Sequence, residues 1–271
     1  MDLSEELLKK IKEKKELSQI SDSFILDILG KYLSKINAEK LKPSEKKIIV
    51  KEVRAELRRS AGMFQKGFKS RESLLEKGDF ANLLKTHSST AERIDFYSEL
   101  KKLILKLNPK SILDLGCGLN PIALASPYVV YYAVDIREDE LNMINTFFEK
   151  NSIKGRVFSQ DLRKPIDNLP EADLCLIFKI FDILESKGHK QAEYIIKSVK
   201  CKNILISFST RTLSGKPMRL ARRLWLERML SRLGYKFTMV NSSNEIFYIV
   251  EKPIKRSLNN SKTTKNFQTS C

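Results

Sequence analysis

The sequence predicts an α/β fold in which an all-helical N-terminal domain precedes a seven-stranded, mostly parallel sheet with an antiparallel terminal hairpin. Three observations lead to this prediction. Apolar residues recur at helical spacing up to about residue 105. From residue 111 onward, short apolar or β-branched runs alternate with helical patterns, and only a short polar turn separates the last two runs.

The N-terminal helices are predicted from apolar stripes and from a proline. Residues 21–33 carry apolar side chains at a spacing that places them on one helical face. Pro43 and Ser44 then open a second helix, expected over residues 45–63. We expect four apolar residues of this helix to face inward: Ile48, Ile49, Val53 and Leu57. Residues 1–85 are therefore expected to form a separate helical domain.

Five apolar or β-branched runs predict the parallel strands. These runs cover residues 111–116, 129–136, 156–161, 172–180 and 203–209. The helical patterns between them indicate a sheet that is covered on both faces. Two further runs, at 235–240 and 245–250, are separated by four polar residues and predict an antiparallel hairpin.

This order of strands is that of the class I methyltransferase fold, a Rossmann-like sheet in which the seventh strand inserts antiparallel. The corresponding domain is expected over residues 86–253. Residues 254–271 are polar, basic and poor in apolar side chains, so we expect a disordered tail there.

The charge of the chain favours a polyanionic partner. Lys and Arg number 50 against 33 Asp and Glu, a net charge of +17. Residues 40–71 hold eleven basic side chains against three acidic ones, and residues 211–236 hold eight against one. Two separated basic blocks favour an extended nucleic-acid surface, because neutralised phosphates release counterions on binding. A generally basic, soluble surface is the alternative.

Composition excludes several other classes. The 42% share of hydrophobic residues is enough for a sizeable core, so a largely disordered chain is excluded. We expect no membrane partner, because no apolar run approaches the roughly 18 to 20 residues that a span needs. The charged N-terminus does not resemble a secretory signal and predicts a cytoplasmic protein. The four cysteines form no C-x-x-C pair, so neither a metal site nor a disulfide framework is expected.

A glycine loop is the clearest binding motif. It runs from Asp114 to Pro121 (Asp-Leu-Gly-Cys-Gly-Leu-Asn-Pro) directly after the first predicted strand, where Gly116 and Gly118 allow a ligand to approach the backbone. Asp135 ends the next strand, where ribose hydroxyls are expected. A nicotinamide site is disfavoured because Pro121 replaces the third glycine of that motif. Helix capping or solvation is the alternative role for these acids.

Several segments together resemble a known family. They are the stretch Leu-Leu-Lys-Thr-His-Ser-Ser-Thr-Ala-Glu-Arg at 83–93, the glycine loop extended to Leu124, Phe178-Lys179, Phe208, and Leu-Ser-Gly-Lys at 213–216. The resemblance is to the aminoglycoside-resistance 16S rRNA (guanine-N7) methyltransferases, which are class I enzymes dependent on S-adenosylmethionine. It is best between residues 83 and 216. The His-Ser-Ser-Thr-x-Glu-Arg element is specific, because generic class I methyltransferases lack it.

The resemblance implies S-adenosylmethionine as the cofactor and assigns residues to its pocket. Arg93 would pair with the methionine carboxylate, Asp114 would lie near the methionine end, and Asp135 would bridge the ribose hydroxyls. Asp161 would meet the adenine edge beside the Leu162 backbone. The full implied set is His87, Ser88, Ser89, Arg93, Asp114, Gly116, Gly118, Asp135, Asp161, Leu162 and Phe178. A capping or core histidine at 87 and a surface ion pair at 93 are the alternatives.

The resemblance also implies the target, N7 of guanine 1405 in 16S rRNA within the 30S subunit, and hence potential aminoglycoside resistance. N7 carries a lone pair and no proton, so no catalytic residue is required as a general base. Candidates for contact with the base or RNA are Phe178, Lys179, Phe181, Phe208, Arg211, Ser214 and Lys216. Core packing and solvated loop charges are the alternatives for them.

Two residues depart from the family pattern. Asp182 and Ser209 stand where the family has or usually has proline, in loops that would face the target base. They keep open a different rRNA nucleotide or a tRNA as the substrate. A non-catalytic RNA-binding factor in ribosome assembly is a third possibility, although it gives no reason to keep Arg93 and the three acids together.

Overall fold

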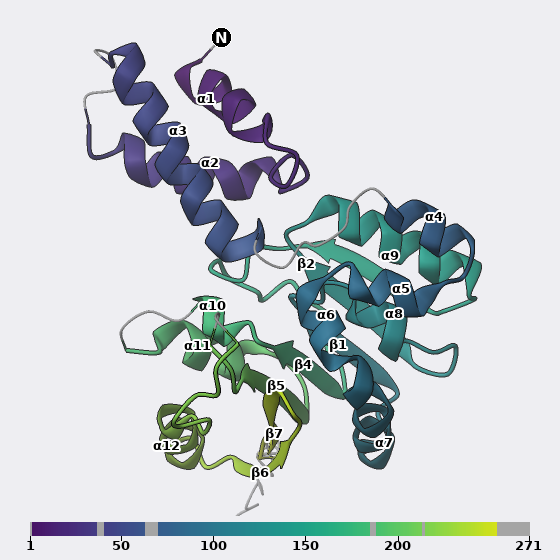
Figure 1. The fold of residues 1–271 in the computed structure, drawn as a ribbon. Coiled ribbons are helices and arrows are strands. Elements are labelled where there is room, and N and C mark those ends of the chain that lie inside the picture. The colour runs from purple at the N-terminus through teal and green to yellow at the C-terminus, as the bar shows by residue number, and fades with distance from the viewer. Residues whose placement is uncertain (1, 37–40, 63–69, 185–187, 213–214, 254–271) are drawn as a thin grey trace, which may run out of the picture.

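The structure is a computed structural model in which residues 2–36, 41–62, 70–184, 188–212 and 215–253 are described. It has an N-terminal body of helices and a larger sheet domain (Figure 1). The expected tail and Ser214 lie outside the described residues. None of the helices in these ranges is long and apolar enough to cross a membrane.

The N-terminal body consists of α1 (Leu3–Lys12), α2 (Asp22–Leu33) and α3 (Pro43–Leu57), with a π-helical turn, Arg58–Gly62, after α3. Its core is a cluster of apolar side chains from all three helices: Leu7, Ile11, Phe24, Ile25, Ile28, Leu29, Val53 and Leu57 among others. The helix predicted after Pro43 is present. Ile48, however, is 56% exposed and Val50 is buried instead, so the predicted inward face was wrong at that residue.

The helices α4 (Arg71–Glu76) and α5 (Phe80–Lys85) pack with the sheet domain and not with the N-terminal body. Leu75, Leu83 and Leu84 belong to the same apolar cluster as β1 and α9 residues. The N-terminal cluster draws its buried side chains from residues 7–57, so we propose that the helical domain, expected over residues 1–85, ends before α4.

The sheet has all seven predicted strands, in the order β3-β2-β1-β4-β5-β7-β6. Their bounds are β1 Ser111–Leu115, β2 Val130–Asp135, β3 Gly155–Ser159, β4 Leu174–Phe178, β5 Asn203–Ser209, β6 Lys236–Asn241 and β7 Glu245–Glu251. The first five pair in parallel, whereas β7 is antiparallel to both β5 and β6. The class I methyltransferase fold is thereby confirmed.

Helices cover both faces of the sheet, as predicted. The remaining helices are α6 (Ser88–Arg93), α7 (Tyr97–Leu107), α8 (Asn120–Leu124), α9 (Glu138–Lys150), α10 (Phe181–Leu184), α11 (Lys190–Ser198) and α12 (Leu224–Arg232). Along β4, Leu174 and Leu176 enter one apolar cluster while Cys175 and Ile177 enter the other. This two-sided burial is why β4 is an unbroken apolar run.

The N-terminal body joins the sheet domain next to Asp135. Ile20 forms an isolated antiparallel bridge with Arg137, two residues beyond the end of β2. The buried Arg137 guanidinium also donates to the carbonyl of Glu16 at 3.0 Å. The N-terminal body is thus bonded to the turn that carries one of the predicted cofactor residues.

Candidate functional site

The candidate site lies at the carboxyl ends of the parallel strands, and the glycine loop after β1 is its base. Gly116 and Gly118 have φ angles of +66° and +48°, which a residue with a side chain rarely adopts. A Cβ on Gly116 would collide with Ile180, and one on Gly118 would lie 3.1 Å from the His87 ring. Both positions therefore favour glycine for conformation, and a side chain at 118 would also press on the buried His87 ring.

Asp135 is held against this loop by backbone donors. Its carboxylate accepts the N–H groups of Gly118 at 3.0 Å, Ile136 at 2.7 Å and Arg137 at 3.1 Å. Burial, reinforced by the nearby Glu140 charge, raises the pKa of Asp135 to about 6. The structure therefore brings Asp135 beside the glycine loop, as the spacing predicted.

Asp114 is fully buried at the end of β1. The hydroxyl of Tyr131, which the sequence analysis missed, donates to its Oδ2 at 2.7 Å. Its Oδ1 makes no hydrogen bond with any described residue. Burial raises the pKa of Asp114 to about 7, despite that hydrogen bond and the Arg93 charge, which lower it.

Arg93 is also buried, with 1% of its surface exposed, so the alternative of a surface ion pair is wrong. Its Nη1 donates to Asn120 Oδ1 at 2.7 Å, and its Nη2 donates to Ser89 Oγ at 3.2 Å. Nη2 also bonds Glu245, on β7, at 2.9 Å. No described residue accepts a hydrogen bond from its Nε.

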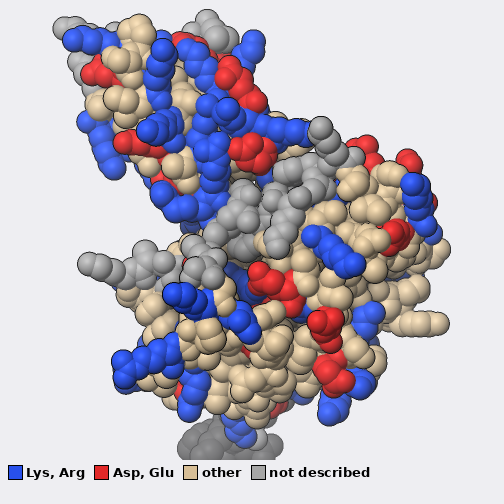
Figure 2. Space-filling model, in the orientation of Figure 1, with Lys and Arg blue, Asp and Glu red and all other residues tan. Residues whose placement is uncertain are grey.

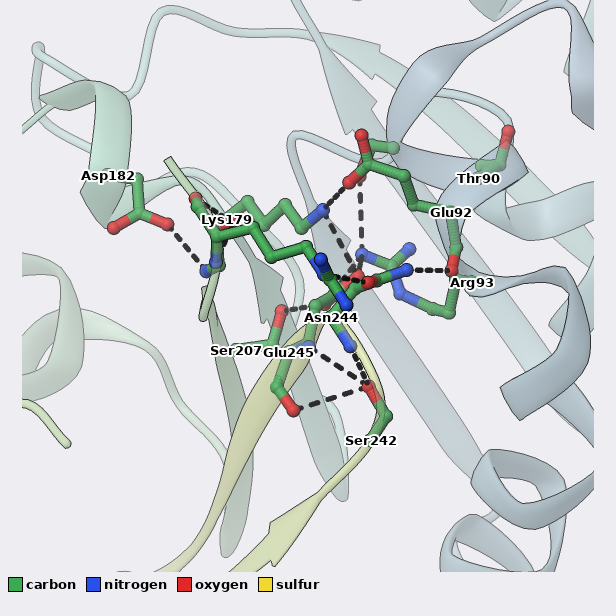
Figure 3. Close-up of polar contacts among 12 residues, drawn as sticks. Thr90, Glu92, Arg93, Lys179, Asp182, Ser207, Ser242, Asn244 and Glu245 are labelled. Carbon is green, nitrogen blue, oxygen red and sulfur yellow. Dashed lines mark hydrogen bonds and ion pairs between the residues drawn. The ribbon is translucent and has the colours of Figure 1, made fainter. Parts of the chain in front are cut away.

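Glu245 is the buried centre of a chain of alternating charges that ends at the exposed Glu92 (Figure 3). Lys179 Nζ lies 3.3 Å from Glu245 and 2.5 Å from Glu92, and Ser207 Oγ donates to Glu245 at 2.6 Å. Burial raises the pKa of Glu245, but Arg93 and Lys179 more than offset this and hold it below its ordinary value. The carboxylate is therefore ionised at neutral pH.

His87 and the two serines precede Arg93 on the chain and line the same region. His87 directly precedes α6, and its ring lies against Gly118. Burial lowers its pKa to about 4, so the imidazole is neutral at physiological pH. Ser88 and Ser89 form the first turn of α6, and Ser89 accepts the Arg93 bond.

Asp161, predicted for the adenine edge, is engaged by a neighbour in this structure. Its carboxylate accepts from Arg163 Nε at 2.9 Å and Nη2 at 2.7 Å, and that guanidinium lies 4.0 Å from the centre of the Phe24 ring on α2. The Leu162 carbonyl accepts from the Gln191 side chain at 2.5 Å.

The three phenylalanines proposed for base stacking are packed in the core. Phe178, Phe181 and Phe208 are 4%, 1% and 1% exposed. Phe178 packs edge-on against Phe247 with the Arg93 guanidinium 4.8 Å from its centre. In this structure the alternative of core packing therefore describes all three.

The basic candidates lie on the loop that follows β5, at the same edge of the sheet. Arg211 and Lys216 are exposed, and Arg211 forms an isolated antiparallel bridge with Pro217. Arg211 Nε donates to Asn244 Oδ1 at 2.8 Å. By contrast, the Lys179 ammonium is buried in the chain of charges.

The site also contains residues that the sequence analysis missed. Asn120 belongs to the glycine motif and begins α8. Its place in that motif was a signal that could have identified it as a site residue. Glu245 opens the last strand and belongs to no motif, so nothing in the sequence distinguished it. Within the described part of the chain, no group of three or more His, Cys, Asp or Glu side chains is arranged to hold a metal ion.

Comparison with known sequences agrees with this geometry. The profile of the family described as ribosomal RNA methyltransferase (FmrO) matches residues 70–249. A 16S rRNA (guanine(1405)-N(7))-methyltransferase of Serratia marcescens is 28% identical over 190 residues, 68% of this chain and 74% of that protein. The Frankia casuarinae protein of the same name is 25% identical over 177 residues, and the match spans 62% of either chain.

Solved structures show the same fold. The 16S rRNA methyltransferase RmtF, in complex with S-adenosyl-L-homocysteine, superposes with a TM-score of 0.79 at 24% identity, over 93% of this chain and all of that one. The 16S rRNA methylase RmtB gives a TM-score of 0.74 at 24% identity, over 92% of this chain and 98% of that one. Since the family profile covers well over half of the chain, this protein belongs to the ribosomal RNA methyltransferase (FmrO) family.

Proposed function

We propose that this protein transfers a methyl group from S-adenosylmethionine to N7 of guanine 1405 in the 16S rRNA of the 30S subunit, which places it in the cytoplasm. The observation that carries the proposal is the set of the buried Asp114 and Arg93 and the half-buried Asp135 around the glycine loop. The target nucleotide comes from the names of its relatives.

The residues present fit this cofactor. Asp114 Oδ1 and Arg93 Nε are a buried acceptor and a buried donor without hydrogen-bond partners among the described residues. They would bind the ammonium and the carboxylate of an amino-acid moiety, and Asp135 would accept from ribose hydroxyls. When bound, S-adenosylmethionine would supply a methyl group on a positively charged sulfur.

The chain's own contribution to the chemistry would be orientation. Guanine N7 has no proton to remove, and the neutral, buried His87 is not needed as a base. The enzyme must align N7 with the methyl group and exclude water. We propose that Phe178, Phe181 and Phe208 support the pocket wall from the core, because base stacking would require them to leave their present packing.

The basic surface would bind the RNA. Lys and Arg side chains cover much of the N-terminal body, and others lie near the loop after β5 (Figure 2). A footprint spread over two bodies suits the shape of a folded ribosomal subunit better than a short single strand.

The decisive experiment is transfer of tritiated methyl groups to purified 30S subunits, naked 16S rRNA and tRNA in parallel. Borohydride and aniline then cleave RNA at N7-methylguanine. Label in 30S subunits with one cleavage at position 1405 is the expected result. Label in tRNA, or rRNA label without that cleavage, would keep the cofactor chemistry and reject the target. Failure to bind S-adenosylmethionine would favour the assembly-factor alternative.

Cofactor affinity is expected to fall as the pH drops from 7 to 5.5. Asp114 must be ionised to pair with an ammonium, and its pKa of about 7 means that protonation competes below that pH. The affinity should fall by up to about tenfold per pH unit. Calorimetric titration measures this, with 5′-methylthioadenosine, which lacks the amino-acid moiety, as the control ligand. Equal pH dependence for both ligands would contradict this role of Asp114.

Replacing Lys47 and Lys51 on α3 together by alanine is expected to weaken 30S binding and its salt dependence. Both side chains are exposed. The slope of log affinity against log salt should fall by about 0.7 to 0.9 for each lysine that contacts a phosphate. The control is the same change at Lys101 and Lys106, exposed on α7. Equal losses for the two pairs would indicate a general charge effect.

A further inference from the structure

One arginine bonds both ends of the basic loop after β5. Arg223 directly precedes α12, and its Nη2 donates to the carbonyl of Ser209, the last residue of β5, at 2.9 Å. Its Nη1 donates to the carbonyl of Ala221 at 2.7 Å. The exposed Arg211 and Lys216 lie between these two anchor points.

The same guanidinium reaches the loop after β4. Its Nη2 lies 3.2 Å from Asp182 Oδ1, while the other oxygen of Asp182 accepts the N–H of Ser209 at 2.9 Å. Asp182, Ser209 and Arg223 therefore form a closed three-way contact, which we term the clamp. Two of its members are the residues at which this chain departs from the family's prolines, and a proline at 209 would have no N–H to donate.

The Arg223 side chain is enclosed by neighbouring residues. The Arg223 side chain is 13% exposed, and its guanidinium lies 5.0 Å from the centre of the Phe208 ring. Its backbone N–H donates to the Tyr248 hydroxyl at 2.7 Å. A charged group this enclosed needs its partners, so its position is well defined.

Backbone hydrogen bonds of Thr210, the first residue after β5, hold the start of the loop. Thr210 donates to the Asn244 carbonyl at 2.8 Å and accepts the N–H of Met218 at 2.8 Å. Since the clamp fixes the residue before Thr210 and the residue after Arg222, it sets the direction in which Arg211 leaves the sheet.

We propose that Asp182, Ser209 and Arg223 are positioning residues that aim residues 210–212 and 215–222 at the RNA substrate and thereby set which nucleotide reaches the methyl group. This inference rests on the proposed function. The clamp acts through Arg211 and Lys216 and takes no part in cofactor binding.

The test compares full-length Asp182→Ala, Asp182→Asn and Arg223→Gln with the wild type. Arg156→Gln is the matched control, because Arg156 is exposed on β3, lies outside both basic blocks and loses the same charge. Asparagine keeps one acceptor oxygen but sets its amide N–H₂ against the second donor, so Asp182→Asn should fall between the wild type and Asp182→Ala. Amide hydrogen exchange of residues 215–222 in the free protein shows whether the clamp orders these residues. Methyl transfer to 30S subunits shows whether that order matters for the reaction.

We expect Asp182→Ala and Arg223→Gln to exchange these amides about tenfold faster than the wild type. Their kcat/KM for 30S subunits should fall by about ten- to a hundredfold, with cleavage at secondary guanines and unchanged affinity for S-adenosyl-L-homocysteine. Unchanged exchange would overturn the clamp whatever the activity. Faster exchange with unchanged kcat/KM and cleavage pattern would overturn its positioning role. If the wild type were inactive on every RNA, the proposed function would be rejected. The exchange rates of the variants would still show whether the clamp orders residues 215–222.

Discussion

Asp135→Ala is expected to abolish methyl transfer and to weaken binding of S-adenosylmethionine by about 10²- to 10⁴-fold. A carboxylate that accepts two hydroxyl donors contributes about 1.5 to 3 kcal/mol for each bond. The substitution also disturbs the glycine loop, because the N–H groups of Gly118, Ile136 and Arg137 lose their common acceptor. The ligand-binding conformation of the glycine loop would then be less populated.

Isothermal titration with S-adenosyl-L-homocysteine measures this prediction directly. Asp135→Asn is the informative companion, since its amide oxygen can still accept from some of the three backbone donors. We expect it to retain more of the wild-type thermal stability than Asp135→Ala while still binding the ligand weakly. Wild-type affinity in the alanine variant would refute the ribose assignment.

The sheet was predictable because its strands carry a strong local signal. The apolar run of β4 is buried on both sides, and a short unbroken apolar run between turn residues has few other uses in a soluble chain. The acids at the strand ends followed from the same reasoning, since parallel strands bring their carboxyl ends to one edge. Asp114 and Asp135 therefore met at the glycine loop as expected.

Contacts between distant segments could not be predicted in the same way. Ile48 and Val50 are both apolar, and only the packing of α3 on α1 and α2 decides which of them is buried. Phe208 is as suitable for stacking on a base as for packing under Arg223, and its type does not distinguish these uses. Glu245 lies 152 positions from its partner Arg93, and no spacing rule relates them.

Glu245→Ala is expected to lower the free energy of unfolding by about 3 to 5 kcal/mol, the usual cost of removing one partner from a buried ion pair. Arg93 and Lys179 are 1% and 6% exposed, so the variant would leave Arg93 with only the neutral Asn120 and Ser89 as described hydrogen-bond partners, and Lys179 with only the exposed Glu92 as an ion-pair partner among the described residues. Equilibrium urea unfolding at pH 7 measures the change. Glu251→Ala is the control, because Glu251 is exposed at the other end of β7 and should change stability by less than about 0.5 kcal/mol.

The pH dependence separates loss of charge from loss of packing. The pKa of Glu245 is below its ordinary value in the folded protein, so its ionised form stabilises the fold above about pH 4.5. That stabilisation is lost as the pH falls further and the carboxylate is protonated. The wild type and Glu245→Gln, which keeps the shape without the charge, should therefore differ most near neutral pH and converge in acid. A constant difference from pH 7 to below pH 4 would mean that Glu245 acts through its shape and hydrogen bonds, and that its charge does not hold Arg93 in place.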